Sequence, residues 1–488
     1  MAKKTTQFDY EILVRYMLPK GMLDTFEVTN VDEECTGLYD ETNTEIRILH
    51  IYLDERDLRD DVWHDLKPNG FTEPRVFNDF PVREHKVALH VRRRRWLTED
   101  GKNQLLDTPA LIADGTSYSI EFAAFLKKWL DTYPVTAQCV ARFFQTDGKY
   151  LNRVYKEHLS DFEDWDQKDH AAEWVLFAQN MGTHLSIDES MLHNDLFTFL
   201  SNKEGHGKRG TLIAAVKGTT IAEVAMRLMA IPEEKRLAVK EVTMDFSDSM
   251  MGIIKQVFPN AEIVIDCFHI MQLAGKGLEE MRMKLKRAAV TERNMQESKF
   301  KKLVQARRKA RAYYAKNHKP KKSKNGKTLG RPRKRKNEKF QPEILANGET
   351  KVELLTHVRY PLLKSGNDWT DWQKKGMKIL FELDNRIKTG YGLVCALRNI
   401  FKKKQSRKKA KKALHAWYKN IGRSHIRELI AVRDTIKEKE EYVLNYFNNR
   451  STNASAESLN SKMKGFRAQV RGVADLTFFM YRMMMIFG

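Results

Sequence analysis

The stretch VTMDFSDSMMGIIKQVFPNAEIVIDCFHI, residues 242–270, constrains the fold more than any other part of the sequence. It holds two short apolar runs, each of which ends in an aspartate, Asp245 and Asp266, and His269 follows the second. A segment with helical spacing, closed by a Phe-Pro-Asn turn, separates the two runs. Short apolar runs bounded by turn residues favour buried strands, and a helix between them favours parallel pairing. The stretch therefore predicts an α/β sheet that carries carboxylates where its strands end.

The elements around this stretch extend the pattern over residues 183–285. Three apolar runs, HLSIDES, LFTFLSN and TLIAAVKG, come in close succession, and a helical run, TIAEVAMRLMAI, follows them. With residues 242–270 and a further helix from about His269, the element order becomes βββαβαβα. Three meandering strands followed by two helix-connected strands predict an α/β catalytic core with a ribonuclease H-like mixed sheet.

Strand order decides which carboxylates meet in such a core. The predicted order is 3-2-1-4-5, so strand 1, which we expect to end at Asp188, lies beside strand 4, which ends at Asp245. Because parallel neighbours end at the same edge of a sheet, both carboxylates would emerge there. Asp266 ends strand 5, one strand further out at about 4.8 Å. Asp188 and Asp245 are therefore the better placed pair.

A third carboxylate comes from the C-terminal residues 451–488, which we expect to be helices that complete the core. In NASAESLNSKMKGFRAQVRG, one helical stripe is apolar. A different stripe carries a carboxylate, an amide and an ammonium at spacing i, i+3 and i+7: Glu457, Asn460 and Lys464. An exposed polar face is the alternative interpretation. In the predicted core, Glu457 would join the two aspartates.

Three carboxylates in one place predict a divalent metal site. They repel one another unless cations lie between them, and hard oxygen ligands suit Mg²⁺. We expect two Mg²⁺ ions, for which Mn²⁺ could substitute, held by Asp188, Asp245 and Glu457. Asp266, His269 and Asn460 are expected to support these ligands without touching the metal. A structural role is the alternative for His269.

The charge of the chain points to a polyanionic partner. Its 488 residues include 86 Lys and Arg against 64 Asp and Glu, a net charge of +22. Such an excess favours nucleic acid, although a merely basic protein remains the alternative. Residues 286–450 are predicted to be a basic helical insertion in the core, and within them residues 301–340 hold 18 Lys or Arg and one acid. The part from 319 to 339 has few large apolar residues, so we expect it to be disordered until it binds.

Residues 118–160 predict a helix-turn-helix. SIEFAAFLKKWLDTY is amphipathic, and a QTDG turn joins two further helical runs, TAQCVARFF and KYLNRVYKEHL. The apolar faces of these two runs would pack together. Residue types suited to phosphates and base edges are left outward: Lys149, Asn152, Arg153 and Lys156. Lys464 is a further DNA-binding candidate, and a plain helical hairpin is the alternative.

Residues 1–105 predict a small α+β region. EIRILHIYLDE and HKVALHVRRRRWL alternate apolar and polar residues, as strands do. The arginines at 92–95 either contact phosphates or form a solvated strand end. The four cysteines are not close in sequence, so we expect neither zinc nor disulfides. The chain lacks a signal peptide and any apolar run near the ~18 residues of a membrane span, so we expect a cytoplasmic protein without a membrane partner.

Three segments together resemble the catalytic blocks of one transposase family. THLSIDES, VTMDFSDSMMGIIKQVFPNAEIVIDCFHIMQL and NASAESLNSKMKGFRAQVRG are similar to those of the insertion-sequence L-three (ISL-three) family of DDE transposases. The similarity covers roughly residues 118–488. It implies that the metal-binding DDE residues are Asp188, Asp245 and Glu457, and that an Asp-x-x-His signature falls on Asp266 and His269.

The resemblance also implies a function. Such enzymes are encoded by bacterial insertion sequences, bind the terminal inverted repeats of double-stranded DNA, cut and join strands at a target, and act as homo-oligomers at the nucleoid. Typical members carry N-terminal cysteine knuckles, whereas VRRRRWLTEDGKN holds no cysteine, so the chain resembles a branch without zinc. The alternatives are a catalytically inactive DNA-binding protein derived from a transposase, and a nuclease or resolvase that cuts DNA without joining it to a target.

Overall fold

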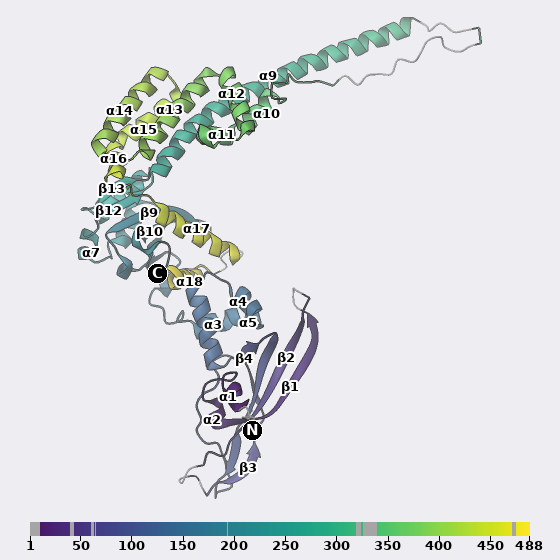
Figure 1. The fold of residues 1–488 in the computed structure, drawn as a ribbon, viewed down its shortest axis with the longest axis vertical. Helices are drawn as coiled ribbons and strands as arrows, with labels where there is room; N and C mark the ends of the chain where they lie inside the picture. The colour runs from purple at the N-terminus through teal and green to yellow at the C-terminus, as the bar shows by residue number, and fades with distance from the viewer. Residues whose placement is uncertain are drawn as a thin grey trace, which may run out of the picture. The chain divides into compact units, whose positions relative to one another are not determined.

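The computed structural model describes residues 10–39, 43–59, 63, 65–192, 194–318, 324–325, 339–470 and 475–488. It has the mixed α/β character that the sequence predicts, with several sheets and many helices (Figure 1). The chain forms two compact units. Unit 1 comprises residues 1–240, 252–260 and 454–488, and unit 2 comprises residues 241–251 and 261–453.

The N-terminal part of unit 1 is a four-stranded sheet in the order β1-β2-β5-β4. Its strands are β1 (Phe26–Tyr39), β2 (Glu45–Glu55), β4 (Arg75–Val82) and β5 (His85–Arg92). A smaller sheet joins β3 (Lys67–Phe71), β6 (Arg94–Leu97) and β7 (Asn103–Gln104), and α1 (Tyr10–Arg15) and α2 (Met22–Thr25) precede both sheets. The first predicted strand matches β2 residue for residue, whereas the second, residues 85–97, is divided into β5 and β6, which lie in different sheets.

The first two arginines of the run at 92–95, at and just after the end of β5, pair with carboxylates of β2. Arg92 lies opposite Asp54 in the parallel pairing of β2 and β5 and donates two hydrogen bonds to its carboxylate, at 2.7 and 2.6 Å. Arg93 donates to Glu55 at 2.6 Å. Asp54 and Glu55 are buried, so these arginines neutralise carboxylates at the end of β2. This pairing with buried carboxylates is a role that neither interpretation of the arginines included.

Three helices follow in unit 1, where the sequence predicts a helix-turn-helix. They are α3 (Ile120–Thr132), α4 (Ala137–Phe143) and α5 (Gly148–Val154), and a π-helical turn, η1 (Tyr155–Leu159), extends α5. The apolar faces of α4 and α5 are buried against one another and against α3, as predicted. At Gly148 a Cβ atom would lie 2.9 Å from Cα of Gln138, so the two helices can approach this closely only with glycine there.

The meander that the sequence predicts forms the centre of unit 1. The strands β9 (His184–Leu192), β10 (Asp195–Asn202) and β11 (Leu212–Lys217) pair antiparallel, and β8 (Trp174–Leu176) pairs with β11. The expectation that the first strand ends at Asp188 is wrong. Asp188 lies opposite Phe199 in mid-strand, and pairing with β10 continues through Leu192. The strand continues past the charged residues 188–189 because β10 supplies hydrogen-bond partners for the backbone on both sides of them.

Helices complete the core of unit 1. The predicted helix after β11 is α6 (Ile221–Leu228), and a short helix that was not predicted, α7 (Glu233–Leu237), follows it with Pro232 as its N-cap. The C-terminal helices are α17 (Ala454–Gln469) and α18 (Leu476–Phe487). Leu459, Met463 and Phe466 of the predicted apolar stripe are buried against β10 and β11.

Unit 2 begins with a parallel strand pair and continues as helices. The pair is β12 (Glu241–Met244) and β13 (Glu262–Ile265), with α8 (Asp248–Val257) between them in the chain. The helices after α9 are α10 (Lys351–His357), α11 (Arg359–Leu363), α12 (Asp371–Leu383), α13 (Asn385–Lys402), α14 (Arg407–Ser424), α15 (Arg427–Glu438) and α16 (Glu440–Asn449). One apolar core joins them to β13 and the first turns of α9. The chain order β9-β10-β11-α6-α7-β12-α8-β13-α9 confirms the predicted sequence of elements, apart from the additional short helix α7.

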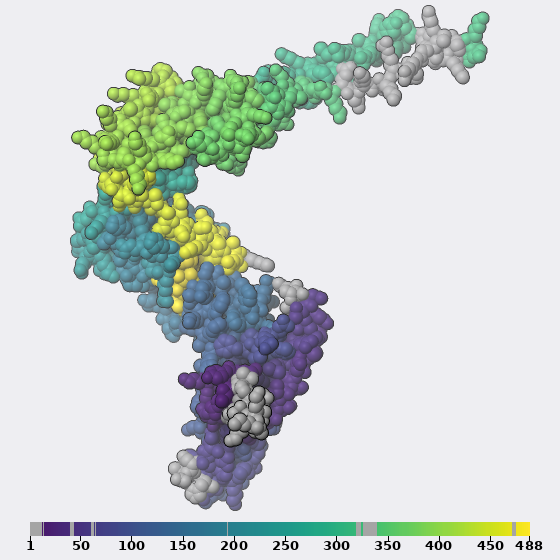
Figure 2. Space-filling model, in the orientation of Figure 1, coloured from purple at the N-terminus to yellow at the C-terminus, as the bar shows by residue number. Residues whose placement is uncertain are grey.

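The helix α9 (Cys267–Asn317) is 51 residues long. Its first turns are buried among the other helices, whereas most side chains after residue 290 are exposed (Figure 2). It crosses residue 286, where the basic insertion was expected to begin, without a break. The predicted disorder of residues 319–339 falls almost entirely outside the described residues. Among the described residues, no helix is long and apolar enough to span a membrane.

Candidate active site

In unit 2, the ends of β12 and β13 hold two aspartates and a histidine. Asp245 follows β12 directly, and its Oδ1 lies 2.6 Å from Nε2 of His269 in the first turn of α9. The two atoms form an ion-pair contact. Oδ1 of Asp245 is buried and accepts no hydrogen bond of good geometry. A buried carboxylate oxygen in this condition is suited to an additional cation.

Asp266 has a different environment. It is 2% exposed and caps the N-terminus of α9, where Oδ1 accepts a hydrogen bond from the backbone N–H of Phe268 at 3.1 Å. Its Oδ2 accepts one from the backbone N–H of Asn453, also at 3.1 Å. Both oxygens therefore serve backbone donors, and the carboxylate ties the segment after α16 to the start of α9.

Side chains of α16 and the following residues fix the strands that carry these aspartates. Asn445 is buried and donates to the carbonyl oxygen of Ile263 in β13 at 2.9 Å. Asn449 and Ser451 both donate to the carboxylate of Glu241, the buried first residue of β12. The position of Asp245 and Asp266 is thus set by a polar network around a short parallel pair.

In unit 1, Asp188 of β9 is half-buried and bonded to α17. The amide of Asn460 donates from Nδ2 to Oδ2 of Asp188 at 2.5 Å, and the backbone N–H of Glu189 donates to Oδ1 at 2.8 Å. Glu457 lies three residues before Asn460, so it shares the face of α17 that contacts β9. Glu457 itself is exposed. The predicted polar stripe is therefore not uniformly exposed, because its amide is buried and holds a predicted metal ligand.

Further contacts fix the register of α17 within unit 1. Lys462 donates to the carbonyl oxygen of Gly207 at 2.6 Å, and Arg467 donates to that of Met191 at 3.1 Å. These bonds hold the helix to the loop after β10 and to the end of β9. Lys464, a DNA-binding candidate, is exposed.

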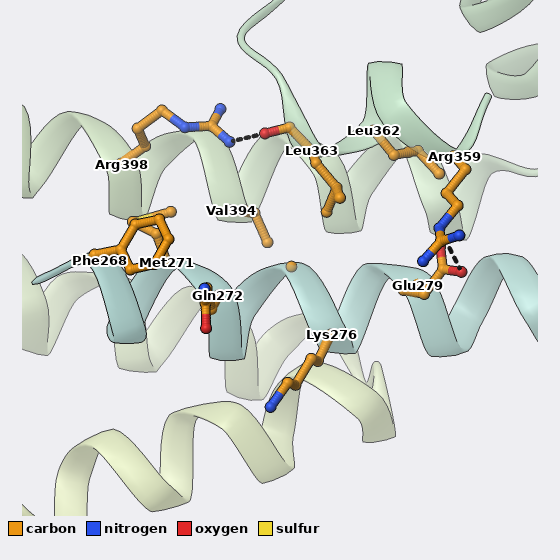
Figure 3. Close-up of a pocket in the computed structure, with 11 residues that line it drawn as sticks. Phe268, Met271, Gln272, Lys276, Glu279, Arg359, Leu362, Leu363, Val394 and Arg398 are labelled. Carbon is orange, nitrogen blue, oxygen red and sulfur yellow. Dashed lines mark hydrogen bonds and ion pairs between the residues drawn. The ribbon is translucent and has the colours of Figure 1, made fainter. Parts of the chain in front are cut away.

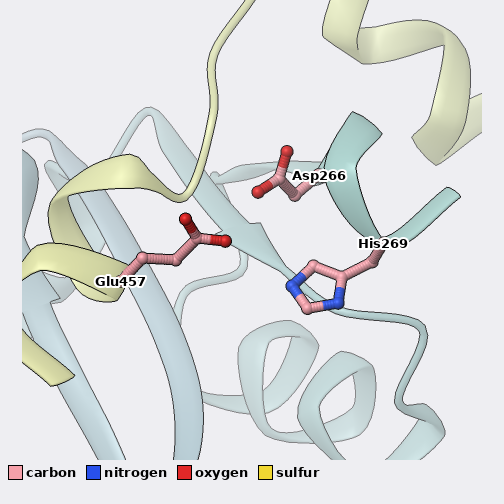
Figure 4. A group of neighbouring side chains, drawn as sticks. All are labelled: Asp266, His269 and Glu457. Carbon is pink, nitrogen blue, oxygen red and sulfur yellow. The ribbon is translucent and has the colours of Figure 1, made fainter. Parts of the chain in front are cut away.

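Several side chains could hold a metal ion. Asp188, Asp245 and Glu457 offer carboxylate oxygens, which are the donors that Mg²⁺ and Mn²⁺ prefer. Asp266, His269 and Glu457, drawn in Figure 4, also offer one ligand atom each. The two sets share Glu457 and differ in the aspartates. Each oxygen of Asp266 already accepts one backbone N–H group, which leaves it fewer lone pairs for a metal ion than Oδ1 of Asp245 has.

The DNA-binding candidates of α5 and η1 differ in their exposure and in their contacts. Lys149, Asn152 and Arg153 are exposed. Lys156 instead forms an ion pair with Asp475, the N-cap of α18, at 2.7 Å. Burial of Asp475 opposes its ionisation, but Lys156 and the backbone N–H of Phe478 hold its pKa below the usual value. Lys156 therefore contributes to the attachment of α18, a role that its outward position in the sequence pattern did not suggest.

Three supporting residues were missed from the sequence. Nothing in the sequence indicates that Asn453 would give its backbone N–H to Asp266, or that Asn449 and Ser451 would hold Glu241. These contacts join segments almost 190 and 210 residues apart along the chain. Only the hydrophilic run NNRSTN after an amphipathic helix marks the segment as polar.

A short strand pair with carboxylates at its ends is typical of enzymes that transfer phosphoryl groups with bound metal ions. Residues 185–483, more than half of the chain, match the family model of the ISL3-type DDE transposases, which is described as a transposase. The chain belongs to this transposase family, as its resemblance indicated. No curated protein is significantly similar to it. Membership in the family implies DNA as the partner and a divalent metal as the cofactor.

Proposed function

We propose that the protein is an active transposase of a bacterial insertion sequence. It binds the terminal inverted repeats of its element and cleaves and joins DNA strands with two divalent cations. The observation that carries this proposal is the family match over residues 185–483, which contains Asp188, Asp245 and Glu457. Each of the two aspartates has a polar partner within its own unit, Asn460 or His269.

The proposed core is a single ribonuclease H-like sheet. In this proposed arrangement the strands run in the order 3-2-1-4-5 that the sequence predicts, with the parallel pair of β12 and β13 continuing the meander. The central strands of that order are β9, which carries Asp188, and β12, which Asp245 follows. A shared metal site requires these two carboxylates and Glu457 to meet, and the Asn460 contact holds α17 at Asp188.

Each residue has a separate task in this proposal. When bound, the metal ions supply an activated water or DNA hydroxyl and stabilise the leaving oxygen. Asp188, Asp245 and Glu457 position the ions, and Asn460 and His269 orient the two aspartates. Asp266 holds the start of α9 through two backbone hydrogen bonds and supports the ligands without touching the metal. Lys149, Asn152 and Arg153 contact the terminal repeat, and Lys464 contacts DNA nearer the catalytic site.

Oligomeric assembly follows from the chemistry of the reaction. Movement of an element requires both of its ends, and each monomer offers one proposed catalytic set. We therefore propose that the protein acts as a homo-oligomer that brings two ends together, as is expected for transposases of this kind.

A strand-transfer assay tests the proposed function. Purified full-length protein is incubated with a labelled duplex of the inverted repeat that flanks its coding region, with Mg²⁺ and a plasmid target. The proposal predicts cleavage at the end of the repeat and labelled DNA joined to the plasmid. Cleavage without joining would identify a nuclease, and binding without either product would identify a catalytically inactive DNA-binding protein. A scrambled duplex is the matched control for sequence specificity.

A further inference from the structure

Unit 2 contains a cavity beside the aspartates that the proposed reaction does not use. It lies between the first turns of α9, α11 and α13 and has a volume of about 410 Å³. This is within the range of about 300–1,000 Å³ of small-ligand sites. Figure 3 shows Phe268 and Met271 at one end, Leu363 and Val394 between the helices, and Arg359 with Glu279 at the other end.

Phe268 links the cavity to the candidate active site. It follows Asp266 by two residues and immediately precedes His269, whose ring it meets edge to face at a centroid distance of 5.4 Å. Although it lies in the first turn of a helix whose neighbouring turns are buried, its side chain is 49% exposed. An aromatic ring that remains exposed at the mouth of an apolar cavity offers a surface on which a planar group can stack.

The residues that follow Phe268 on α9 add polar groups suited to a nucleotide. Phe268, Gln272 and Lys276 are spaced i, i+4 and i+8, so they form one stripe of the helix and line the cavity together. In Figure 3, Gln272 and Lys276 extend from α9 away from α11, which places them at the rim. The stripe thus presents an aromatic ring, an amide that can pair with a base edge, and an ammonium that attracts phosphate.

Two arginines complete the charge around the cavity. Arg398 donates to the carbonyl oxygen of Leu363 at 2.9 Å, which fixes its guanidinium beside the apolar wall. Arg359 lies 3.6 Å from Glu279, and the carboxylate of Glu279 is shared with Arg282 at 2.5 Å. Three cations against one shared carboxylate leave the cavity electropositive, so its charge complements a phosphate group.

We propose that this cavity, between α9, α11 and α13, binds one nucleotide unstacked from the DNA near the cleaved phosphate. The proposal rests on the proposed transposase function. A base inside a duplex cannot reach a cavity, so the nucleotide must leave the stack, and contacts to the extruded base must compensate the lost stacking. Phe268 supplies that stacking, Gln272 contacts the base edge, and Lys276, Arg359 and Arg398 attract the flanking phosphates. Capture of one nucleotide beside Asp245 and His269 would hold the strand in position for the reaction.

The test is a double-mutant cycle between the protein and the DNA. Affinity for the terminal repeat is measured for full-length wild-type protein and for Phe268→Ala, with Ca²⁺ in place of Mg²⁺ so that the DNA is not cut. Each duplex carries an abasic site at a different nucleotide near the end. Base–aromatic stacking predicts that Phe268→Ala weakens binding of the intact repeat about 5–150-fold. At one abasic position, wild type and variant should bind equally, because the base that Phe268 contacts is absent.

Two further variants separate stacking from folding. Phe268→Trp keeps an aromatic face and should restore wild-type affinity for the intact repeat. Trp372→Ala removes a different aromatic side chain, 54% exposed on α12, and should show no coupling to any abasic position. Because half of the Phe268 side chain is already exposed, its truncation should leave the thermal melting of the protein nearly unchanged.

Each other outcome overturns the proposal. If the wild type binds and cleaves the repeat but no abasic position couples to Phe268, the cavity does not hold a base and the transposase function stands. If Phe268→Ala instead changes the oligomeric state, the cavity receives a second copy of the chain. If the wild type neither binds nor cleaves the repeat, both proposals fail.

Discussion

The change Asp266→Asn distinguishes a carboxylate that holds the fold from one that holds a metal. Asn is close to Asp in size and is an equally good helix cap, so its remaining oxygen can still accept the N–H of Phe268. The new NH₂ group then faces the backbone N–H of Asn453, and one buried donor loses its acceptor. Leaving a buried donor unsatisfied costs about 1–3 kcal/mol. We therefore expect the free energy of unfolding of unit 2 to fall by about that amount.

The assay combines urea denaturation with amide hydrogen exchange. The midpoint of unfolding should fall, and the amide of Asn453 should exchange faster than in the wild type, because it no longer has an acceptor. Mg²⁺ affinity should fall no more than the 10–100-fold that is typical of residues around a metal ligand, and some cleavage should remain. The matched control is Asp245→Asn, at a side chain that is 28% exposed and should matter little for stability. If Asp266→Asn unfolds like the wild type yet binds no metal, Asp266 is a direct ligand and the set Asp266, His269 and Glu457 is the correct one.

Three further predictions concern the helices around the site. Replacing Asn460 with Ala should reduce cleavage more than binding of the repeat, because Asp188 loses the donor that orients it, whereas Lys464→Ala on the same helix should weaken binding without altering the rate of bound complexes. Replacing Lys149 and Arg153 with Ala should weaken repeat binding in a gel shift, whereas Asp475→Asn, which breaks only the Lys156 ion pair, should lower thermal stability and leave binding intact. Replacing the exposed Arg308, Lys309 and Lys316 of α9 with Gln should make DNA binding less dependent on salt. The slope of log affinity against log salt concentration should fall by about 0.9 for each phosphate that the helix no longer neutralises. An unchanged slope would exclude this helix from the DNA interface.

The order of elements could be predicted from the sequence because each one has a strong local signal. Short apolar runs indicated β9 to β13, and the apolar stripe of Leu459, Met463 and Phe466 indicated α17, whose burial is as predicted. The end of β9 could not be predicted at Asp188, because strand length there depends on pairing with β10 and not on the local sequence. Pairing is a long-range property that the periodicity of one strand does not contain.

In the candidate site, too, local sequence signals predicted the residue types, whereas long-range contacts could not be predicted. The types of residue that could bind metal were evident, since carboxylates after apolar strands are rare without a reason. His269 and Asn460 were expected to support the ligands, but which aspartate each contacts was not evident, and the role of Asn453 was missed, because these side chains and the Asn453 backbone meet their aspartates only through the fold. Likewise, Arg92 and Arg93 were interpreted as a surface feature, although the buried Asp54 and Glu55 on a neighbouring strand bind them. Charged residues can be counted in a sequence, but the sequence does not show which oppositely charged residue each of them contacts in the fold.

Cleavage of the labelled terminal repeat by three isosteric variants tests the central claim most directly. The variants are Asp188→Asn, Asp245→Asn and Glu457→Gln, each measured with Mg²⁺ and with Mn²⁺ after a gel shift has shown that the protein binds the repeat. All three should bind DNA like the wild type and lose cleavage and strand transfer with either metal, while Asp266→Asn keeps partial activity. Full cleavage by any of the three would contradict the assignment, and full cleavage by Asp245→Asn together with none by Asp266→Asn would place the second metal ligand at Asp266.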